Sequence, residues 1–69
     1  MKIKIVKLGS RAVEMEVEEG CTVENATKQA ELEIYQQNLS IDGVACGPSS
    51  VVREGCVVML IPKAEGGQL

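Results

Sequence analysis

The chain has 69 residues, a formal net charge of -3 and one aromatic residue, a tyrosine. A chain this short forms one domain that buries only about 60 % of its unfolded surface, which leaves no room for a catalytic cleft beside its scaffold. Its seven basic residues are scattered and it has no Phe or Trp, which argues against nucleic-acid binding, because that needs a basic face and stacking aromatics.

Charged residues interrupt the apolar residues at the start of the sequence, Met1-Lys2-Ile3-Lys4. A signal peptide or a membrane anchor needs a longer apolar stretch. We therefore expect a cytoplasmic protein that has no membrane partner.

The first two predicted elements are strands joined as a hairpin. Apolar residues alternate with lysines in residues 1–8 and with glutamates in residues 12–18. A two-residue turn at Gly9-Ser10 would set Ile5 opposite Glu14 and place a charge on the apolar face, so we predict a three-residue loop or a bulge. The lysines then face the glutamates, and exposed pairs of this kind contribute about 1 kcal/mol or less each. This face is predicted to be solvated, not a metal or substrate site.

A short helix is predicted next, over residues 23–32. Thr22 can cap its first turn, and Glu24 suits the positive end of the helix dipole. The residues at helical spacing are small, so the helix can cover one face of a small sheet and no more. This stripe consists of Val23, Ala26, Thr27 and Ala30.

The pattern then returns to strands. Alternation in residues 39–41, the turn pair Asp42-Gly43 and the run 44–46 predict a second hairpin. Glu54-Gly55 marks another turn, and residues 56–61 are apolar on both faces, which is typical of a central strand. We place this last strand parallel to the first. The order of elements predicts an α+β, ubiquitin-like β-grasp fold, with a mixed four- to five-stranded sheet and one helix on one face.

Three cysteines, Cys21, Cys46 and Cys56, stand at wide spacing in a chain without histidine. Four thiolate or imidazole ligands cannot be assembled, so we expect no structural metal site. The favoured interpretation is that the three cysteines are small, buried hydrophobic residues of a protein in a reducing compartment. A reactive thiol is the alternative, and only Cys21, just before the predicted helix cap, has a suitable placement for a lowered pKa.

Two glycines, Gly66 and Gly67, follow the last predicted strand. Glycine is the costliest residue to order and adds no side chain to a core, so this pair has no task within the fold. We predict a β-grasp domain over residues 1–63 and a flexible tail over residues 64–69 whose glycines serve a partner. A frayed terminus without a role is the alternative.

The sequence resembles the ThiS and MoaD sulfur carriers of thiamine and molybdopterin synthesis over essentially the whole chain. The resemblance is carried by its end, Val58-Met59-Leu60-Ile61-Pro62-Lys63-Ala64-Glu65-Gly66-Gly67, and by the helix start Gly20-Cys21-Thr22-Val23-Glu24-Asn25-Ala26. The Ile41-Asp42-Gly43 hairpin and the Glu54-Gly55 turn resemble theirs as well. Its length is closer to the ThiS side of the family.

The resemblance implies a carrier protein, not an enzyme, with no catalytic residue and no bound cofactor of its own. In that family an adenylating enzyme uses ATP to convert the carboxylate of the last glycine, here Gly67, to an acyl adenylate. A sulfur donor displaces AMP and leaves a thiocarboxylate, which delivers sulfide to an acceptor synthase for thiamine-type or related cofactor or metabolite biosynthesis. Gly67 has no Cβ to hinder attack, and Gly66 lets the tail thread a narrow channel.

This chain departs from the family at Gln68-Leu69, because the working form of the carriers ends at the second glycine. The Gly67 carbonyl is here part of a peptide bond and cannot be adenylated. We expect a peptidase to remove Gln68-Leu69, a role often filled by JAMM-type metalloproteases.

The likeness to ubiquitin-like folds, counted back from the glycines, places Val58 and Leu60 under the helix and Met59 and Ile61 on the other face of the sheet. Met59, Ile61 and Pro62 are the predicted partner-binding residues, because an uncovered apolar patch beside the tail is a natural docking surface. A patch covered by loops or by a homodimer is the alternative.

Two other functions fit the same sequence. A ubiquitin-like protein modifier would pass activated Gly67 to a lysine amine. A β-grasp interaction module would never be activated, and alanine could then replace Gly66 and Gly67 without effect.

Overall fold

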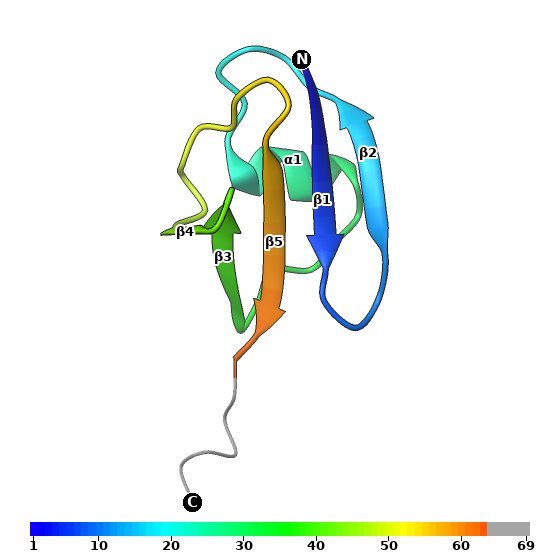
Figure 1. The fold of residues 1–69 in the computed structure, drawn as a ribbon, viewed down its shortest axis with the longest axis vertical. Coiled ribbons are helices and arrows are strands. Elements are labelled where there is room, and N and C mark those ends of the chain that lie inside the picture. Colours follow the sequence, from blue (N-terminus) through cyan, green and yellow to red (C-terminus); the bar gives the residue numbers. More distant parts are fainter. Residues whose placement is uncertain (64–69) are drawn as a thin grey trace, which may run out of the picture.

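The computed structural model describes residues 1–63, which form a five-stranded sheet with one helix packed behind it (Figure 1). The strands are β1 (Lys2–Lys7), β2 (Ala12–Glu16), β3 (Gln37–Ile41), β4 (Val44–Cys46) and β5 (Val57–Pro62), and the helix is α1 (Val23–Gln29). Their order across the sheet is β2-β1-β5-β3-β4. β5 lies parallel to β1, and the other neighbouring strands are antiparallel. The predicted β-grasp fold and the central place of the last strand are confirmed.

The β1–β2 hairpin has a three-residue loop, one of the two predicted alternatives. Ile5 pairs with Val13, so apolar residues stand opposite each other. The Lys7 amide donates to the Arg11 carbonyl at 2.8 Å, which closes the loop at residues 8–10. Lys4 pairs with a glutamate of β2, as expected for a solvated face.

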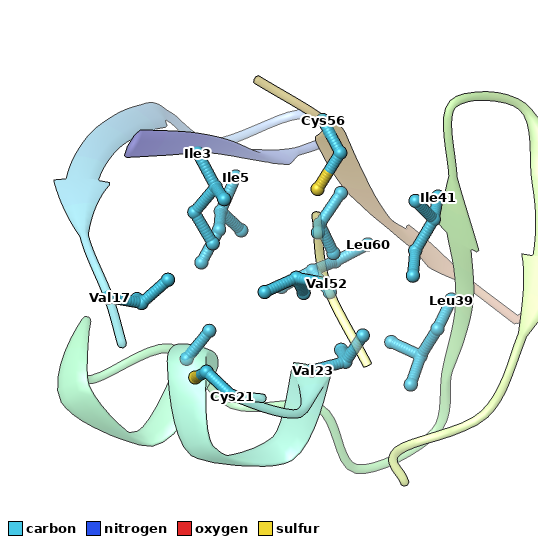
Figure 2. Packing of buried hydrophobic residues seen from close by; sticks show 12 residues of the cluster. Ile3, Ile5, Val17, Cys21, Val23, Leu39, Ile41, Val52, Cys56 and Leu60 are labelled. Atoms are coloured by element: carbon cyan, nitrogen blue, oxygen red, sulfur yellow. The ribbon is translucent and has the colours of Figure 1, made fainter. Parts of the chain in front are cut away.

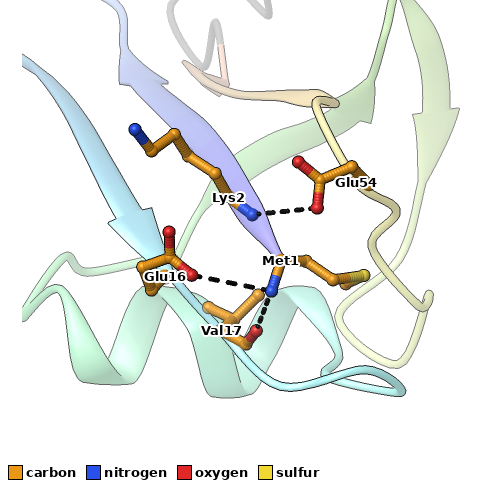
Figure 3. Close-up of polar contacts among 5 residues, drawn as sticks. All are labelled: Met1, Lys2, Glu16, Val17 and Glu54. Carbon is orange, nitrogen blue, oxygen red and sulfur yellow. Dashed lines mark hydrogen bonds and ion pairs between the residues drawn. The ribbon is translucent and has the colours of Figure 1, made fainter.

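The start of β1 is held from both sides (Figure 3). The α-amino group of Met1 donates to the Val17 carbonyl at 2.8 Å and lies 3.7 Å from Oε1 of Glu16. On the other side, the Lys2 amide donates to Oε1 of Glu54 at 3.2 Å. The turn that precedes β5 is therefore tied to the first residues of β1.

α1 begins as predicted. Thr22 has an extended backbone, and its side-chain oxygen accepts the Asn25 amide at 3.2 Å. The buried Thr27 hydroxyl contacts the carbonyls of the preceding turn, at 2.9 Å from Val23 and 3.0 Å from Glu24.

Within residues 1–63 no helix is long and apolar enough to cross a membrane.

The end of α1 was predicted wrongly, at residue 32 instead of Gln29. Glu31 adopts a left-handed conformation with φ 60°. The Leu32 amide donates to the Thr27 carbonyl at 2.9 Å, and the Glu31 amide donates to the Lys28 carbonyl at 3.1 Å. These two bonds form a Schellman motif, in which glycine is the usual left-handed residue. A glutamate at that position gives no sequence signal for the end of the helix.

The core lies between α1 and the sheet face that α1 covers (Figure 2). Val23 of α1 and Val52 of the segment before β5 face the sheet residues in that view. Backbone bonds tie this segment to the start of the helix: the Val52 amide donates to the Cys21 carbonyl at 2.9 Å, and the Val23 amide to the Ser50 carbonyl at 2.9 Å. The buried apolar residues are Ile3, Ile5, Val17, Cys21, Val23, Ala26, Leu39, Ile41, Val52, Cys56, Val58 and Leu60.

Candidate functional site

Successive residues of β5 point to opposite faces of the sheet. Val58 and Leu60 are 0 % exposed and belong to the core under α1. Met59 and Ile61 are half-buried on the other face, which we call the open face. The predicted faces of these four residues are confirmed. Because β5 is the central strand, Met59 and Ile61 lie in the middle of the open face.

Val6 and Leu8 lie beside Met59 and Ile61 on the open face. Val6 pairs with Met59 across the β1–β5 ladder. Leu8, in the turn that follows β1, is 49 % exposed, and its amide donates to the Leu60 carbonyl at 3.0 Å, which continues the register beside Ile61. We call Val6, Leu8, Met59 and Ile61 the apolar patch. Sequence reasoning missed Val6 and Leu8, although the alternation of residues 1–8 puts all even positions on one face.

Polar residues bound the apolar patch on the neighbouring strands. On β3, Ser40 pairs with Met59 and Asn38 pairs with Ile61. Nearer the start of β1, Lys4 pairs with Val57 of β5. An apolar centre with a polar margin is the usual anatomy of a protein interface.

The end of β5 is fixed by the loop before β3. The Lys63 amide donates to the Gln36 carbonyl at 3.1 Å, and Gln36 is left-handed with φ 59°. Pro62 pairs with Gln37 and is exposed. By alternation along β5, Pro62 is on the same face of the sheet as Leu60 and not on the face of Ile61. The structure therefore brings Met59 and Ile61 together but does not bring Pro62 into the apolar patch.

The predicted activation site, Gly66 and Gly67, lies outside the described residues, as do Gln68-Leu69 and the whole predicted tail of residues 64–69. Gly67 follows Lys63 by four residues in the sequence. Four residues of extended chain span at most about 14 Å. A partner that covers the apolar patch, which ends at Ile61, is therefore within reach of Gly67.

The three cysteines are buried or half-buried, and Cys21 does not have the lowered pKa that a reactive thiol requires. Cys21 and Cys56 are buried in the core, and Cys46 is half-buried. Burial raises the pKa of the Cys21 thiol, and the negative charge of Glu18 raises it further. This contradicts the alternative of a reactive thiol at Cys21, which required a lowered pKa. Within residues 1–63, no three Cys, Asp or Glu side chains gather closely enough to hold a metal ion.

A five-stranded mixed sheet in this order, with one helix on one face, defines a ubiquitin-like β-grasp protein. No protein-family model and no curated protein sequence matches the chain, but solved structures do. SAMP1 from Haloferax volcanii is 20% identical at a TM-score of 0.78 and aligns over 97% of this chain and 100% of its own. A Pyrococcus furiosus protein described as molybdopterin converting factor, subunit 1, is 19% identical at 0.72, over 91% of this chain and 98% of its own.

A third solved structure, a ubiquitin-like protein from Caldiarchaeum subterraneum, is 27% identical at a TM-score of 0.59. It aligns over 93% of this chain and 97% of its own. At sequence identities this low, the structural likeness establishes the fold alone, and the alignments span nearly the full length of each structure. The chain therefore has a ThiS/MoaD-like β-grasp fold.

Proposed function

We propose that this protein is a sulfur carrier whose reactive group is the carboxylate of Gly67. The observation that carries the proposal is the placement of β5. This central strand holds Met59 and Ile61 on the open face and leads within four residues of Lys63 to a glycine pair that the fold does not need. The likeness of the fold to a protein described as molybdopterin converting factor, subunit 1, supports it.

In the proposed reaction the chain is a cosubstrate of an adenylating enzyme, and ATP is bound by that enzyme. The Gly67 carboxylate attacks the α-phosphate of ATP and displaces pyrophosphate, which gives an acyl adenylate. A hydrosulfide equivalent from a sulfur donor then attacks the acyl carbon and AMP leaves. The resulting thiocarboxylate delivers its sulfur to an acceptor synthase in thiamine-type or related biosynthesis.

The Gly67 carboxylate must first be freed. Gln68-Leu69 follow Gly67, and a peptide carbonyl has no oxyanion to attack ATP. We propose that a peptidase of the JAMM type hydrolyses the Gly67–Gln68 bond. Glycines on the substrate side let the chain enter a narrow peptidase or adenylating site in conformations that other residues resist.

The apolar patch is the proposed docking surface for the adenylating enzyme and the acceptor synthase. Its centre is apolar and its margin is polar, with Ser40 and Asn38 on one side. The patch ends beside the last residues of β5, so a partner seated on it receives the chain that leads to Gly67. With this arrangement the partner supplies all acid, base and nucleotide-binding groups.

The test uses two recombinant forms, the full chain and a chain that ends at Gly67. Each is incubated with an adenylating enzyme from the same genome, ATP and a sulfide source, and its intact mass is measured. We expect the form that ends at Gly67 to gain the mass that corresponds to replacement of one carboxyl oxygen by sulfur. The full chain should remain unchanged until a host lysate removes Gln68-Leu69. A full chain that becomes thiocarboxylated while it keeps both residues would refute the processing step.

A protein modifier is the second candidate, and the likeness to SAMP1 favours it. A second solved structure is described as small archaeal modifier protein 1 and matches at 19% identity and a TM-score of 0.73. In this case the activated Gly67 acyl group passes to a lysine amine of another protein. Conjugates of higher mass in cells, lost when Gly67 is deleted, would establish this outcome. An interaction module that is never activated would instead tolerate alanine at Gly66 and Gly67.

A further inference from the structure

The two edge strands of the sheet differ in charge. β2 carries Glu14 and Glu16, whereas β4 consists of Val44-Ala45-Cys46 and has no charge. The unpaired backbone groups of an edge strand can pair with a strand of another molecule, and charges, proline, a bulge or a very short strand oppose this pairing. The glutamates protect β2, and β4 is limited only by its short length.

The free backbone groups of β4 belong to Ala45. Asp42-Gly43 forms a two-residue turn, so Ile41 and Val44 exchange backbone hydrogen bonds. Alternation then turns the amide and carbonyl of Ala45 away from β3. Within residues 1–63 no strand lies beyond β4, and Ala45 is exposed.

The side chains at this edge are unusually apolar for a surface. Val44 is 69% exposed and Val51 is 52% exposed. These are two of the four exposed large hydrophobic residues within residues 1–63. A hollow of about 280 Å³ lies beside them. It is lined by Ile41, Asp42, Val44, Ala45, Cys46, Ser50, Val51 and Arg53.

We propose that β4 is a pairing edge for a second copy of this chain, antiparallel and two-fold symmetric about Ala45. Each Ala45 amide donates to the Ala45 carbonyl of the other copy, which satisfies all four free groups. Val44 of one copy lies beside Cys46 of the other, at the apolar wall of the hollow. Gly43 and Gly47, which flank β4, oppose each other across the axis and bring no side chain into the interface.

Charge selects this edge for self-association. Each copy carries a net charge of -3, so contact between two copies is favoured where unpaired acidic side chains are few. At the β4 edge Asp42 lines the hollow, and its Oδ2 lies 3.5 Å from Nη2 of Arg53, which offsets its charge. Pairing two β2 edges would bring Glu14 and Glu16 against the same residues of the second copy, and like charges opposite each other are destabilising. β4 has no such cost. The proposed dimer leaves the apolar patch and the end of β5 free, and it does not depend on the function proposed above.

Amide exchange measured by NMR over a concentration series tests the proposal directly. The Ala45 amide should exchange progressively more slowly as the full chain is concentrated. Ala12 is the internal control, because its amide faces outward at the β2 edge by the same alternation. Sedimentation of the same samples should show a monomer–dimer equilibrium. A monomer throughout, with an Ala45 exchange rate that does not change, would overturn the proposal.

Two matched variants locate the interface. Ala45→Pro removes an outward amide, which an edge strand tolerates, and deletes two hydrogen bonds per dimer. The dissociation constant should rise about tenfold or more. Ala12→Pro makes the same change at the other edge and should leave it unchanged. Val44→Lys, at an exposed side chain, should weaken the dimer without altering the backbone. Dimers that persist in both β4 variants, or that Ala12→Pro weakens equally, would assign self-association elsewhere.

Discussion

Aspartate placed separately at the neighbouring positions Leu60 and Ile61 should separate folding from partner binding. The two side chains belong to the same strand but lie on opposite faces. Leu60 is 0 % exposed in the core, and Ile61 is half-buried in the apolar patch. The same chemical change therefore meets two different environments at adjacent positions.

The expected magnitudes differ by several kcal/mol. Truncating a buried leucine costs about 2–5 kcal/mol, and burying an unpaired carboxylate adds several more. A domain of this size is stable by roughly 3–10 kcal/mol, so Leu60→Asp should unfold it. Ile61→Asp gives up only part of one side chain's burial, about 1 kcal/mol, and leaves its carboxylate in water.

Urea denaturation followed by circular dichroism, together with calorimetric titration against the adenylating enzyme, measures both effects. Ile61→Asp should keep a cooperative transition with an unchanged slope and should bind about 10- to 100-fold more weakly, because an isoleucine buried at an interface contributes roughly 1.5–3 kcal/mol. Asn38→Asp is the matched control. It adds a charge to the open face beside Ile61 without removing apolar surface.

Three outcomes would refute this reasoning. A folded Leu60→Asp variant would show that the faces of β5 are reversed. Loss of cooperative unfolding in Ile61→Asp would show that the open face is part of the core. Equal weakening by Asn38→Asp would show that the charge alone, and not the lost apolar contact, opposes the partner.

Three further predictions concern stability. Asp42 is left-handed at φ 52°, and its Oδ1 accepts the Val57 amide at 2.9 Å, so Asp42→Ala should cost about 2–4 kcal/mol in urea denaturation, while Asp42→Asn keeps an acceptor and should cost less. Glu31→Gly should relieve the strain of φ 60° and raise stability by about 0.5–1 kcal/mol, seen as a higher Tm. Because the pKa of the Cys21 thiol is raised in the folded state, this group contributes to folding stability. The contribution is complete below the ordinary thiol pKa and is lost as pH rises through the folded-state pKa. The urea midpoint should therefore fall with alkaline pH, and more steeply than in Cys21→Ala.

The strand pairing was predictable because burial imposes a period of two. Matching apolar residues across the first hairpin excluded a two-residue turn and favoured a three-residue loop or a bulge, and Ile5 indeed pairs with Val13. The last strand is apolar on both faces, and only a central strand needs that. Val58 and Leu60 fill the core, while Met59 and Ile61 are left for the open face.

The end of α1 and the full extent of the apolar patch were not predicted, for different reasons. Glu31 has good helix propensity and takes a left-handed conformation only because the Leu32 amide bonds back to Thr27, a contact that no local pattern announces. Leu8 follows β1 and lies within a turn, so its place beside Ile61 depends on the parallel pairing of β1 with β5. Leu8 and Ile61 become neighbours only through the pairing of two segments that are distant in the sequence.

The placement of the apolar patch follows from the same parallel pairing, and this links the fold to the proposed function. Parallel strands end at the same edge of the sheet, so Val6 and Leu8 accompany Met59 and Ile61 toward the end of β5. A partner that binds the apolar patch would contact a strand that is hydrogen-bonded on both sides. This strand is also fixed at Lys63, whose amide donates to the Gln36 carbonyl. An antiparallel first strand would end at the opposite edge, away from the point where the chain leaves toward Gly67. A central last strand parallel to the first would thus supply both the proposed docking surface and a fixed starting point for the residues proposed to react.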